Sequence, residues 1–383
     1  MIKITDKTRC SGCGACASTC PTKCIQMTLD SEGFLYPRVD TASCIDCGLC
    51  EKVCPILNPY SNKKIESIGC FAAYSNNQEI RKESSSGGIF SEMANNVFDN
   101  NGVVFGAAFD DDWSVKHTYI ETADEIKRLS GSKYVQSDIN DSYINAKKFL
   151  DEGRQVLFSG TPCQIGGLYS FLNKEYDNLI TVDFICHGVP SRIVWDEYLK
   201  IQKETANADI IDISFRNKDN GWAKYNTKIS FENGEEYVKY HSDDMFMKTY
   251  LSDISLRPAC YYCSFKGKNR KSDITLADYW GVNRAHPEIN DDKGISLIFI
   301  NSKCGQLLID KIKGNLFMKN VDENEVVKYN KSINLSSPVH PNRRFFMKRF
   351  PKHKFNILQK SLKITLFNRL MRKVKLKLKI RKY

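Results

Sequence analysis

The chain has 383 residues, more than the usual single domain of roughly 100–200 residues, so we expect a small module followed by a larger domain. No stretch approaches the roughly 18 consecutive apolar residues of a membrane span, which argues against an integral membrane protein. No signal-peptide pattern precedes the 15 cysteines, so we expect a reducing cytoplasm, where clustered cysteines indicate metal ligands rather than disulfides.

The net charge of +11 is concentrated near the C-terminus. Eighteen Lys and Arg lie from Lys328 to Lys382, and no acidic residue follows Glu325. The residues up to 325 therefore carry 38 basic against 45 acidic side chains. Because a body that binds nucleic acid is normally basic, we expect no nucleic acid among the partners.

Two runs of four cysteines open the sequence, and both have the spacing of bacterial ferredoxins. They are Cys10-x2-Cys13-x2-Cys16-x3-Cys20-Pro21 and Cys44-x2-Cys47-x2-Cys50-x3-Cys54-Pro55. The fourth cysteine of each run ligates the other cluster in this pattern. We therefore predict one 4Fe-4S cluster on Cys10, Cys13, Cys16 and Cys54, and a second on Cys44, Cys47, Cys50 and Cys20.

Zinc is the alternative for these thiols, but zinc sites usually present separated CxxC pairs. Cys24 falls outside the pattern and is interpreted as a packed thiol. Residues 1–60 thus predict a ferredoxin-type domain with two clusters. The polar, turn-rich segment 58–64 is expected to separate it from a second domain over 65–330.

In this second domain, apolar runs rich in β-branched residues alternate with helical patterns, which favours an α/β domain. Strands are predicted at 68–74, 103–109, 155–159 and 179–186, and helices at 88–98, 141–151 and 193–203. Strand-like segments between 209 and 240 contain an Asn233-Gly234 hairpin signal, so part of the sheet is expected to be antiparallel.

Four further cysteines lie near turns. Cys163 and Cys186 each follow a predicted strand, and Cys260 and Cys263 form a pair. Each alone is a weak signal, since a single cysteine at a strand end is more often a core residue. Together they are enough for a third cluster.

Several motifs, in order along the chain, resemble the beta-subunit family of coenzyme F-420 hydrogenases and dehydrogenases. The resemblance spans about residues 1 to 330. It rests on Ser84-Ser85-Ser86-Gly87-Gly88, Gly131-Ser132-Lys133-Tyr134, Gly160-Thr161-Pro162-Cys163-Gln164, Ile185-Cys186-His187-Gly188, Phe215-Arg216-Asn217-Lys218 and Asp278-Tyr279-Trp280-Gly281. In that family the domain binds FAD and a 4Fe-4S cluster. The resemblance thus implies FAD here, and a third cluster on Cys163, Cys186, Cys260 and Cys263.

The candidate flavin residues also have a physical basis. A turn of Ser85, Ser86, Gly87 and Gly88 that opens a helix offers free N–H groups, hydroxyls and a positive helix end to a pyrophosphate. The simpler interpretation is a helix N-cap served by a serine. Lys133, Arg216 and Lys218 would balance phosphate charge or stabilise a reduced flavin, although such groups are more often solvated surface residues. Thr161 and Gln164, which flank Cys163, complete the predicted cofactor-binding set.

His187 and Lys133 are the candidate catalytic residues. His187 adjoins the predicted ligand Cys186 and would donate a proton near the flavin, and a structural histidine is the equal alternative. The expected fold class is α+β or α/β. A dicluster ferredoxin domain precedes a mixed α/β flavin-binding domain, and a basic tail follows over 331–383.

We therefore expect a cytoplasmic oxidoreductase that passes electrons from the ferredoxin-type clusters through a third cluster to FAD, and on to an unidentified acceptor. The alternative is an electron-transfer subunit without its own substrate. Either version requires a redox partner, such as a ferredoxin or a partner oxidoreductase subunit. A regulatory protein with vestigial clusters is disfavoured, because all twelve candidate ligands are present.

The basic tail carries a separate hypothesis. Leucines at 358, 362, 366 and 370 fall near one helical face among interspersed Lys and Arg, which is typical of a peripheral helix on an anionic membrane. The segment 356–383 would then hold the protein on the inner face of the membrane. A disordered tail or a contact to an acidic partner subunit is equally compatible with the pattern.

Overall fold

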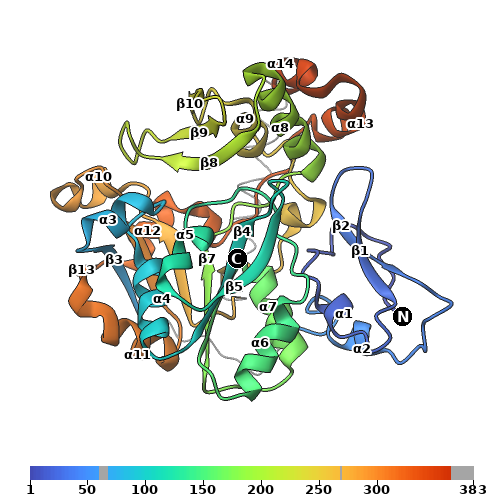
Figure 1. Cartoon of the computed structure of the whole chain (residues 1–383), viewed down its shortest axis with the longest axis horizontal. Coiled ribbons are helices and arrows are strands. Elements are labelled where there is room, and N and C mark those ends of the chain that lie inside the picture. The colour runs from blue at the N-terminus through green and yellow to red at the C-terminus, as the bar shows by residue number, and fades with distance from the viewer. Residues whose placement is uncertain (60–67, 268–269, 364–383) are drawn as a thin grey trace.

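The computed structural model describes residues 1–59, 68–267 and 270–363. Figure 1 shows a small N-terminal domain in blue, a central sheet flanked by helices, and an upper module that combines yellow-green strands with the red C-terminal helices. The three parts contain sheets of two, eight and three strands respectively. The fold is thus mixed α/β with a ferredoxin-type domain at its N-terminus, as the sequence predicts.

The N-terminal domain is small and has little apolar core. It consists of α1 (Ala15–Ser18), the antiparallel pair β1 (Ile25–Leu29) and β2 (Leu35–Val39), and α2 (Leu49–Lys52). Its buried cluster contains Ile2 and Ile25 together with Cys24 and Cys50, and further cysteines pack around it. Because so small an apolar core contributes little stability, what the cysteines bind must hold the domain together.

The central sheet is mostly parallel in its middle and antiparallel at both ends. Its strand order is β13-β3-β12-β11-β7-β6-β4-β5. The bounds are β3 (Gly69–Ser75), β4 (Val103–Phe109), β5 (Val115–Ile120), β6 (Val156–Gly160), β7 (Leu179–Phe184), β11 (Ile274–Asp278), β12 (Ser296–Ile300) and β13 (Leu316–Asn320). Strands β4, β6, β7 and β11 are parallel, so their carboxyl ends share one edge of the sheet.

Helices cover both faces of this sheet, as the alternation along β6 shows. Val156 and Phe158 pack in one core, and the intervening Leu157 packs in another on the opposite face. The first face is covered by α6 (Ser142–Asp151) and α7 (Pro162–Leu172), the second by α4 (Ile89–Asp99) and α11 (Lys303–Ile312). The remaining helices of this domain are α3 (Gln78–Glu83), α5 (Ile126–Leu129), α10 (Val282–Ala285) and α12 (Glu323–Tyr329).

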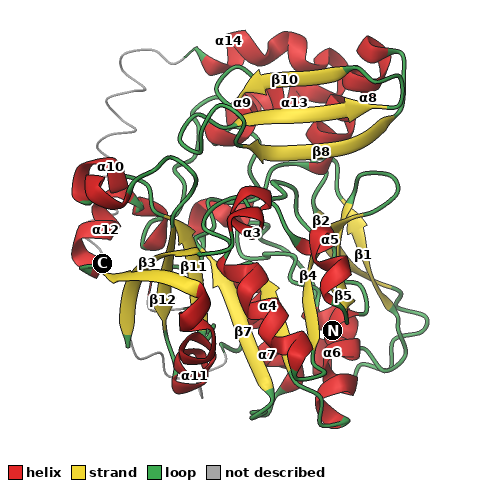
Figure 2. Ribbon diagram, turned by 60° about the vertical axis from the view of Figure 1, so that its left-hand side comes forward, coloured by secondary structure: helices red, strands yellow, loops and turns green. Residues whose placement is uncertain are grey.

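The upper module lies beyond the upper edge of the central sheet in Figure 2. It contains the antiparallel strands β8 (Ile210–Asn217), β9 (Asn226–Phe231) and β10 (Glu236–Tyr240), with α8 (Arg192–Ala206), α9 (Met245–Leu251), α13 (Arg343–His353) and α14 (Leu358–Leu362). The hairpin at Asn233-Gly234 is confirmed, with Gly234 at φ 83° between β9 and β10. These strands form a sheet of their own, so the antiparallel segment does not extend the parallel sheet as the sequence suggested.

Part of the segment assigned to a basic tail is folded. Phe346, Met347 and Phe350 of α13 are buried in the core of the upper module, and Ile357 and Leu358 join them. The apolar side chains of 357 and 358 are therefore committed to the interior. Leu362 also packs against this core, and the remaining residues of that hypothesis, 364–383, lie outside the described part of the chain.

The upper module also contacts the N-terminal domain at its hairpin. Arg343 of α13 forms an ion pair with Glu32 in the β1–β2 turn, with 2.6 Å between Nη2 and Oε2. Ser191, which precedes α8, donates from Oγ to the backbone oxygen of Glu32 at 2.6 Å. The hairpin is thereby attached to the upper module, although most of the central sheet lies between them in the sequence.

Candidate functional site

The eight N-terminal cysteines gather in two separate pockets. Cys10, Cys13, Cys16 and Cys54, here called the inner set, line one of them. Cys20, Cys44, Cys47 and Cys50, the outer set, line the other. The chain thus brings the fourth cysteine of each run to the three of the other run, which is the exchange that the ferredoxin spacing predicts.

Local backbone geometry explains how the thiols reach these pockets. Gly14 and Gly48 precede α1 and α2 with φ of 77° and 73°, a conformation that glycine adopts without strain. The backbone N–H of Ile2 donates to Sγ of Cys50 over 3.2 Å, as amides do to cluster-bound sulfur. Burial raises the pKa of the Cys13 and Cys16 thiols to about 12. Binding a metal there must therefore displace the thiol proton.

Cys24 lies beside the outer set, with its Sγ 3.4 Å from that of Cys20, and also lines the outer pocket.

The four cysteines of the central domain also come together, and we call them the third set. Cys163 begins α7 after β6, Cys186 follows β7, and Cys260 and Cys263 lie in and after a 3-10 turn over Pro258–Tyr262. Burial raises the pKa of Cys163 to about 12, and the nearby Cys263, Cys186 and Cys13 thiols raise it further. The set therefore lies at the carboxyl edge of the parallel strands, where α/β proteins bind ligands.

Positive and polar groups surround the third set. Lys266 donates from Nζ to the backbone oxygens of Cys186 and Ser332. Burial lowers the pKa of Lys266, and the neighbouring cysteines oppose this effect. Arg270 bonds to Asp183 and keeps two guanidinium nitrogens buried without a hydrogen-bond partner among the described residues. Sequence reasoning missed both cations, although both fall within the basic segment 266–271, which begins three residues after Cys263.

The segment after α12 closes over the same place. Ser336 accepts a hydrogen bond at Oγ from the backbone N–H of Cys263 over 3.1 Å. Ser337 donates from Oγ to the backbone oxygen of His187 over 2.7 Å. These residues belong to the segment that the sequence assigned to the tail, and they help to position the third set.

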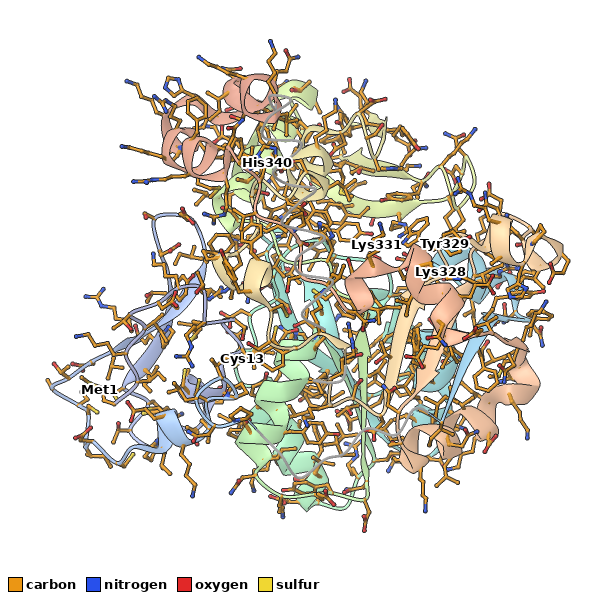
Figure 3. All side chains as sticks on the ribbon, turned by 180° about the vertical axis from the view of Figure 1, so that it is seen from behind. Met1, Cys13, Lys328, Tyr329, Lys331 and His340 are labelled. Carbon is orange, nitrogen blue, oxygen red and sulfur yellow. The ribbon has the colours of Figure 1, made fainter. Side chains whose placement is uncertain are left out.

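The inner and third sets are neighbours. The hydroxyl of Tyr143, on α6, lies 2.9 Å from the backbone oxygen of Cys13 and 2.7 Å from that of Gln164. A Cβ atom at Gly167 of α7 would come 3.1 Å from Sγ of Cys13. Figure 3 labels Cys13 where the blue N-terminal domain meets the green helices. A metal cluster on one set is thus separated from the other by little more than α7.

The predicted flavin residues gather in part at the same sheet edge. The Nζ of Lys218 donates to the backbone oxygens of Ser86, Arg81 and Lys293. Ser85 accepts hydrogen bonds at Oγ from the N–H and hydroxyl of Ser132, next to Lys133. Burial lowers the pKa of both Lys133 and Lys218 to about 8. These groups surround the turn that opens α4.

The structure gives a reason for the glycine at position 87 that the sequence did not reveal. A Cβ there would lie 2.5 Å from the backbone oxygen of Ala73 in β3, so the glycine is required for packing against the sheet. Gly88 has φ 86° and is the N-cap residue of α4.

Thr161 and Gln164 form a capping box at the start of α7, with the N–H of Thr161 donating to Oε1 of Gln164. These two residues position Cys163, which lies two residues after Thr161 and directly before Gln164.

Arg216 lies between the two sheets. It pairs with Asp278 at 2.7 Å, and its guanidinium lies over the rings of Tyr225 and Trp280. Its Nε is buried without a hydrogen-bond partner in the described part of the chain, as are Ser86 Oγ and Trp222 Nε1. Buried polar atoms normally have partners, so these three fit a bound polar molecule such as a flavin.

His187 lies beside the third set, as its position after Cys186 requires. Its Nε2 is 2.8 Å from Oδ1 of the buried Asp253, and its ring meets Tyr250 edge-on at 5.1 Å. The histidine ring is therefore held in one orientation.

None of the helices in the described ranges is long and apolar enough to cross a membrane.

The cysteine sets together are those of an iron-sulfur protein. A family model for a 4Fe-4S dicluster domain matches residues 9–57. Models for the N- and C-terminal parts of the coenzyme F420 hydrogenase/dehydrogenase beta subunit match residues 70–142 and 153–325. The chain belongs to this coenzyme F420 hydrogenase/dehydrogenase beta-subunit family, and carries the dicluster domain at its N-terminus.

Two similar proteins extend the comparison. An uncharacterized protein of Methanocaldococcus jannaschii is 23% identical over 373 residues, which cover 88% of this chain and 92% of that protein. A chain of the F420-reducing NiFe hydrogenase complex from Methanosarcina barkeri is 19% identical with a TM-score of 0.46. That match covers 72% of this chain and 92% of the hydrogenase chain.

Proposed function

We propose that the protein is an iron-sulfur flavoprotein oxidoreductase, in which electrons pass from the two N-terminal clusters through a third cluster to FAD and then to an acceptor. The observation that carries this proposal is the contact between the inner and third sets across Tyr143 and α7. Clusters supply single-electron transfer when bound, and a flavin supplies two-electron chemistry.

The residues of the chain order these sites along one path. Cys47 of the outer set is exposed, and the side chains of Ile45 and Leu49 beside it are also exposed. The inner set lies deeper, against α7, and the third set lies at the sheet edge beyond that helix. A redox partner would therefore contact the chain at the outer set.

The proposed flavin site lies at the carboxyl edge of the strands, beneath the three-stranded sheet. Its support is the group of buried polar atoms without a described partner at Ser86, Arg216 and Trp222. In this site Lys133 and Lys218 would offset the negative charge of the phosphates or of the reduced flavin. Gly87 and Gly88 would shape the turn rather than make space for a phosphate.

His187 is the proposed proton donor. Oδ1 of Asp253 lies 2.8 Å from Nε2 of His187 and would orient the imidazole ring. Ser337 fixes the backbone of the same residue. The histidine would thereby be kept beside the third set.

Anaerobic reconstitution with quantification of iron, sulfide and flavin tests the proposal. We expect about twelve iron atoms, four for each cysteine set, and one FAD per chain. The Cys263→Ser protein should lose up to about four of these irons and retain the N-terminal clusters. The matched control is Cys304→Ser, which removes a cysteine of α11 outside all three sets. Iron near eight in the unmodified protein, with flavin present, would eliminate the third cluster.

The second candidate function, an electron-transfer subunit without its own substrate, is favoured by the exposed outer set. The M. barkeri match is to a chain of a multi-subunit complex. Reduction of a small physiological acceptor by the isolated chain would support the oxidoreductase. If the isolated chain reduced only artificial dyes, and reduced a physiological acceptor once a partner protein was added, the electron-transfer subunit would be favoured.

A further inference from the structure

Arg257 is a fully buried arginine that joins the central domain to the inner set. It precedes the turn that carries Cys260, and its exposed fraction is 0%. Its side chain extends into the N-terminal domain. There Nε donates to the backbone oxygen of Cys10 at 2.9 Å, and Nη2 donates to that of Leu35 at 2.8 Å. The guanidinium also lies 4.4 Å from the centre of the Tyr36 ring.

The same group reaches a sulfur of the inner set. Nη2 of Arg257 lies 3.9 Å from Sγ of Cys10, within the range of an N–H···S hydrogen bond. Gly12 makes room for it, since a Cβ atom at that position would come 2.8 Å from Nη1. The remaining contact is Nη1 to Oε1 of Gln136 at 3.0 Å, which is neutral. The ferredoxin loop is thus built around this guanidinium.

Arg257 differs from the other buried arginines in its counter-charge. Arg81 pairs with Asp291, Arg216 with Asp278 and Arg270 with Asp183. For Arg257, the hydrogen-bond partners within the described residues are carbonyl oxygens, an amide and a thiol, and no carboxylate. A guanidinium cannot lose its proton, and an uncompensated buried charge is costly. The thiolates of the inner set are the anions that would compensate it.

The outer set has no comparable cation among the residues that the structure describes. The residues that line its pocket include Asp46 but no Lys or Arg. The amino terminus of Met1 lies close by, but it pairs with Asp46 and Glu51. Lys3 and Arg9 border the inner pocket, but both are exposed, and water screens their charges. Arg257 is therefore the buried charge that distinguishes the inner pocket from the outer one.

A cluster gains one negative charge on reduction, and a nearby buried cation stabilises that charged state. We propose that Arg257 holds the reduction potential of the inner cluster above that of the outer cluster, so that electrons received outside flow inward to the third set. This inference rests on the proposed function for the direction of flow. The effect of Arg257 on the potential does not depend on flavin or on the third cluster. Arg257 is a positioning residue, because it acts through the cluster and touches no substrate.

The test is a redox titration of full-length protein, reconstituted anaerobically and followed by electron paramagnetic resonance. The variants are Arg257→Gln, which removes the charge, and Arg257→Lys, which keeps it. The Cys47→Ser protein identifies the outer signal, because Cys47 belongs to the outer set. We expect Arg257→Gln to lower the inner potential by at least the tenfold equilibrium change that corresponds to 59 mV for one electron. The outer potential should not move, and Arg257→Lys should retain most of the wild-type value.

Gln136→Met serves as the matched control, because it removes a neutral contact of the same guanidinium and leaves the charge in place. A shift in Gln136→Met as large as that in Arg257→Gln would show that packing rather than charge sets the potential, and would overturn the proposal. So would an unchanged inner potential in Arg257→Gln. If the iron content shows no third cluster while Arg257→Gln still lowers the inner potential, the proposed relay fails and the role of Arg257 stands. Failure of Arg257→Gln alone to assemble the inner cluster, with Arg257→Lys intact, would support a charge requirement.

Discussion

The hydroxyl of Tyr143 lies 2.9 Å from the backbone oxygen of Cys13 and so connects the central domain to the ferredoxin loop. Tyr143 is fully buried, so its hydroxyl cannot be replaced by solvent. We expect Tyr143→Phe to lower the free energy of unfolding by about 1–3 kcal/mol, because buried carbonyl oxygens lose their donor. Electron transfer between the inner and third sets should slow, with iron content unchanged.

Stopped-flow reduction and thermal unfolding of the same samples check this prediction. Tyr169→Phe is the control, because that buried hydroxyl contacts Thr181 and Asp273 within the central domain. If electron transfer slowed equally in Tyr143→Phe and Tyr169→Phe, Tyr143 would have no specific role in transfer between the inner and third sets.

The serine turn allows a test of flavin binding that leaves the fold intact. Ser86→Ala removes a buried hydroxyl that has no described partner, so the folded apoprotein should not lose stability. We expect FAD to bind more weakly by about 2- to 10-fold, the equivalent of one hydrogen bond. Equilibrium dialysis measures the affinity. Ser170→Ala, which removes a similar hydroxyl on α7, should leave it unchanged.

Replacing Gly87 is less informative about FAD. A Cβ at Gly87 would conflict with the backbone oxygen of Ala73, so Gly87→Val should destabilise the central sheet whether or not flavin binds there. Loss of FAD in that variant would follow from misfolding. Normal FAD binding in Ser86→Ala would instead remove the turn from the flavin site.

Lys218 should make stability depend on pH in the alkaline range. Burial lowers its pKa to about 8 in the folded protein, whereas an unfolded lysine titrates at about 10.4. Between these values the unfolded chain binds more protons, so the free energy of unfolding contributed by this group rises as pH increases from 8 to 10. Below pH 8 the full cost of burying the charge remains.

Thermal unfolding of wild type and Lys218→Met at several pH values measures this effect. The wild type should gain stability relative to Lys218→Met between pH 8 and 10. The exposed Lys224→Met is the control and should show a constant difference from wild type. A constant difference for Lys218→Met as well would contradict the lowered pKa.

The membrane hypothesis now calls for a truncation that begins later than the sequence suggested. Ile357 and Leu358 are buried, so deleting 356–383 should cost about 1.5–3 kcal/mol for each of these side chains. Deleting 364–383 spares them. If those residues bind an anionic surface, this deletion should abolish co-sedimentation with vesicles that contain anionic lipid, and salt should weaken binding of the full chain. Equal binding by both proteins would eliminate the membrane role.

The features that could be predicted from the sequence are those that depend on the spacing of residues close together in the chain. The cysteine runs fixed the composition of the inner and outer sets, and β4, β6, α4 and α8 follow from their apolar periodicity. The position of β12 between β3 and β11 could not be predicted, since pairing of distant strands leaves no local pattern.

Long-range contacts were equally invisible in the candidate site. Arg257 and Lys266 resemble surface cations in the sequence, and only the fold brings them to the cysteines. The helix α13 was hidden by its composition, because basic residues surround the apolar positions Phe346, Met347 and Phe350. The basic residues led to the interpretation of this segment as a tail, although Phe346, Met347 and Phe350 fall on one helical face.

The ion pair between Glu32 and Arg343 has a kinetic consequence. It secures the tip of the β1–β2 hairpin to α13, while Arg257 secures both the cysteine loop, through Cys10, and β2, through Leu35. A domain held at several points has little freedom to swing. Transfer from the inner to the third set would then proceed across a fixed gap, and its rate should be indifferent to the viscosity of the medium.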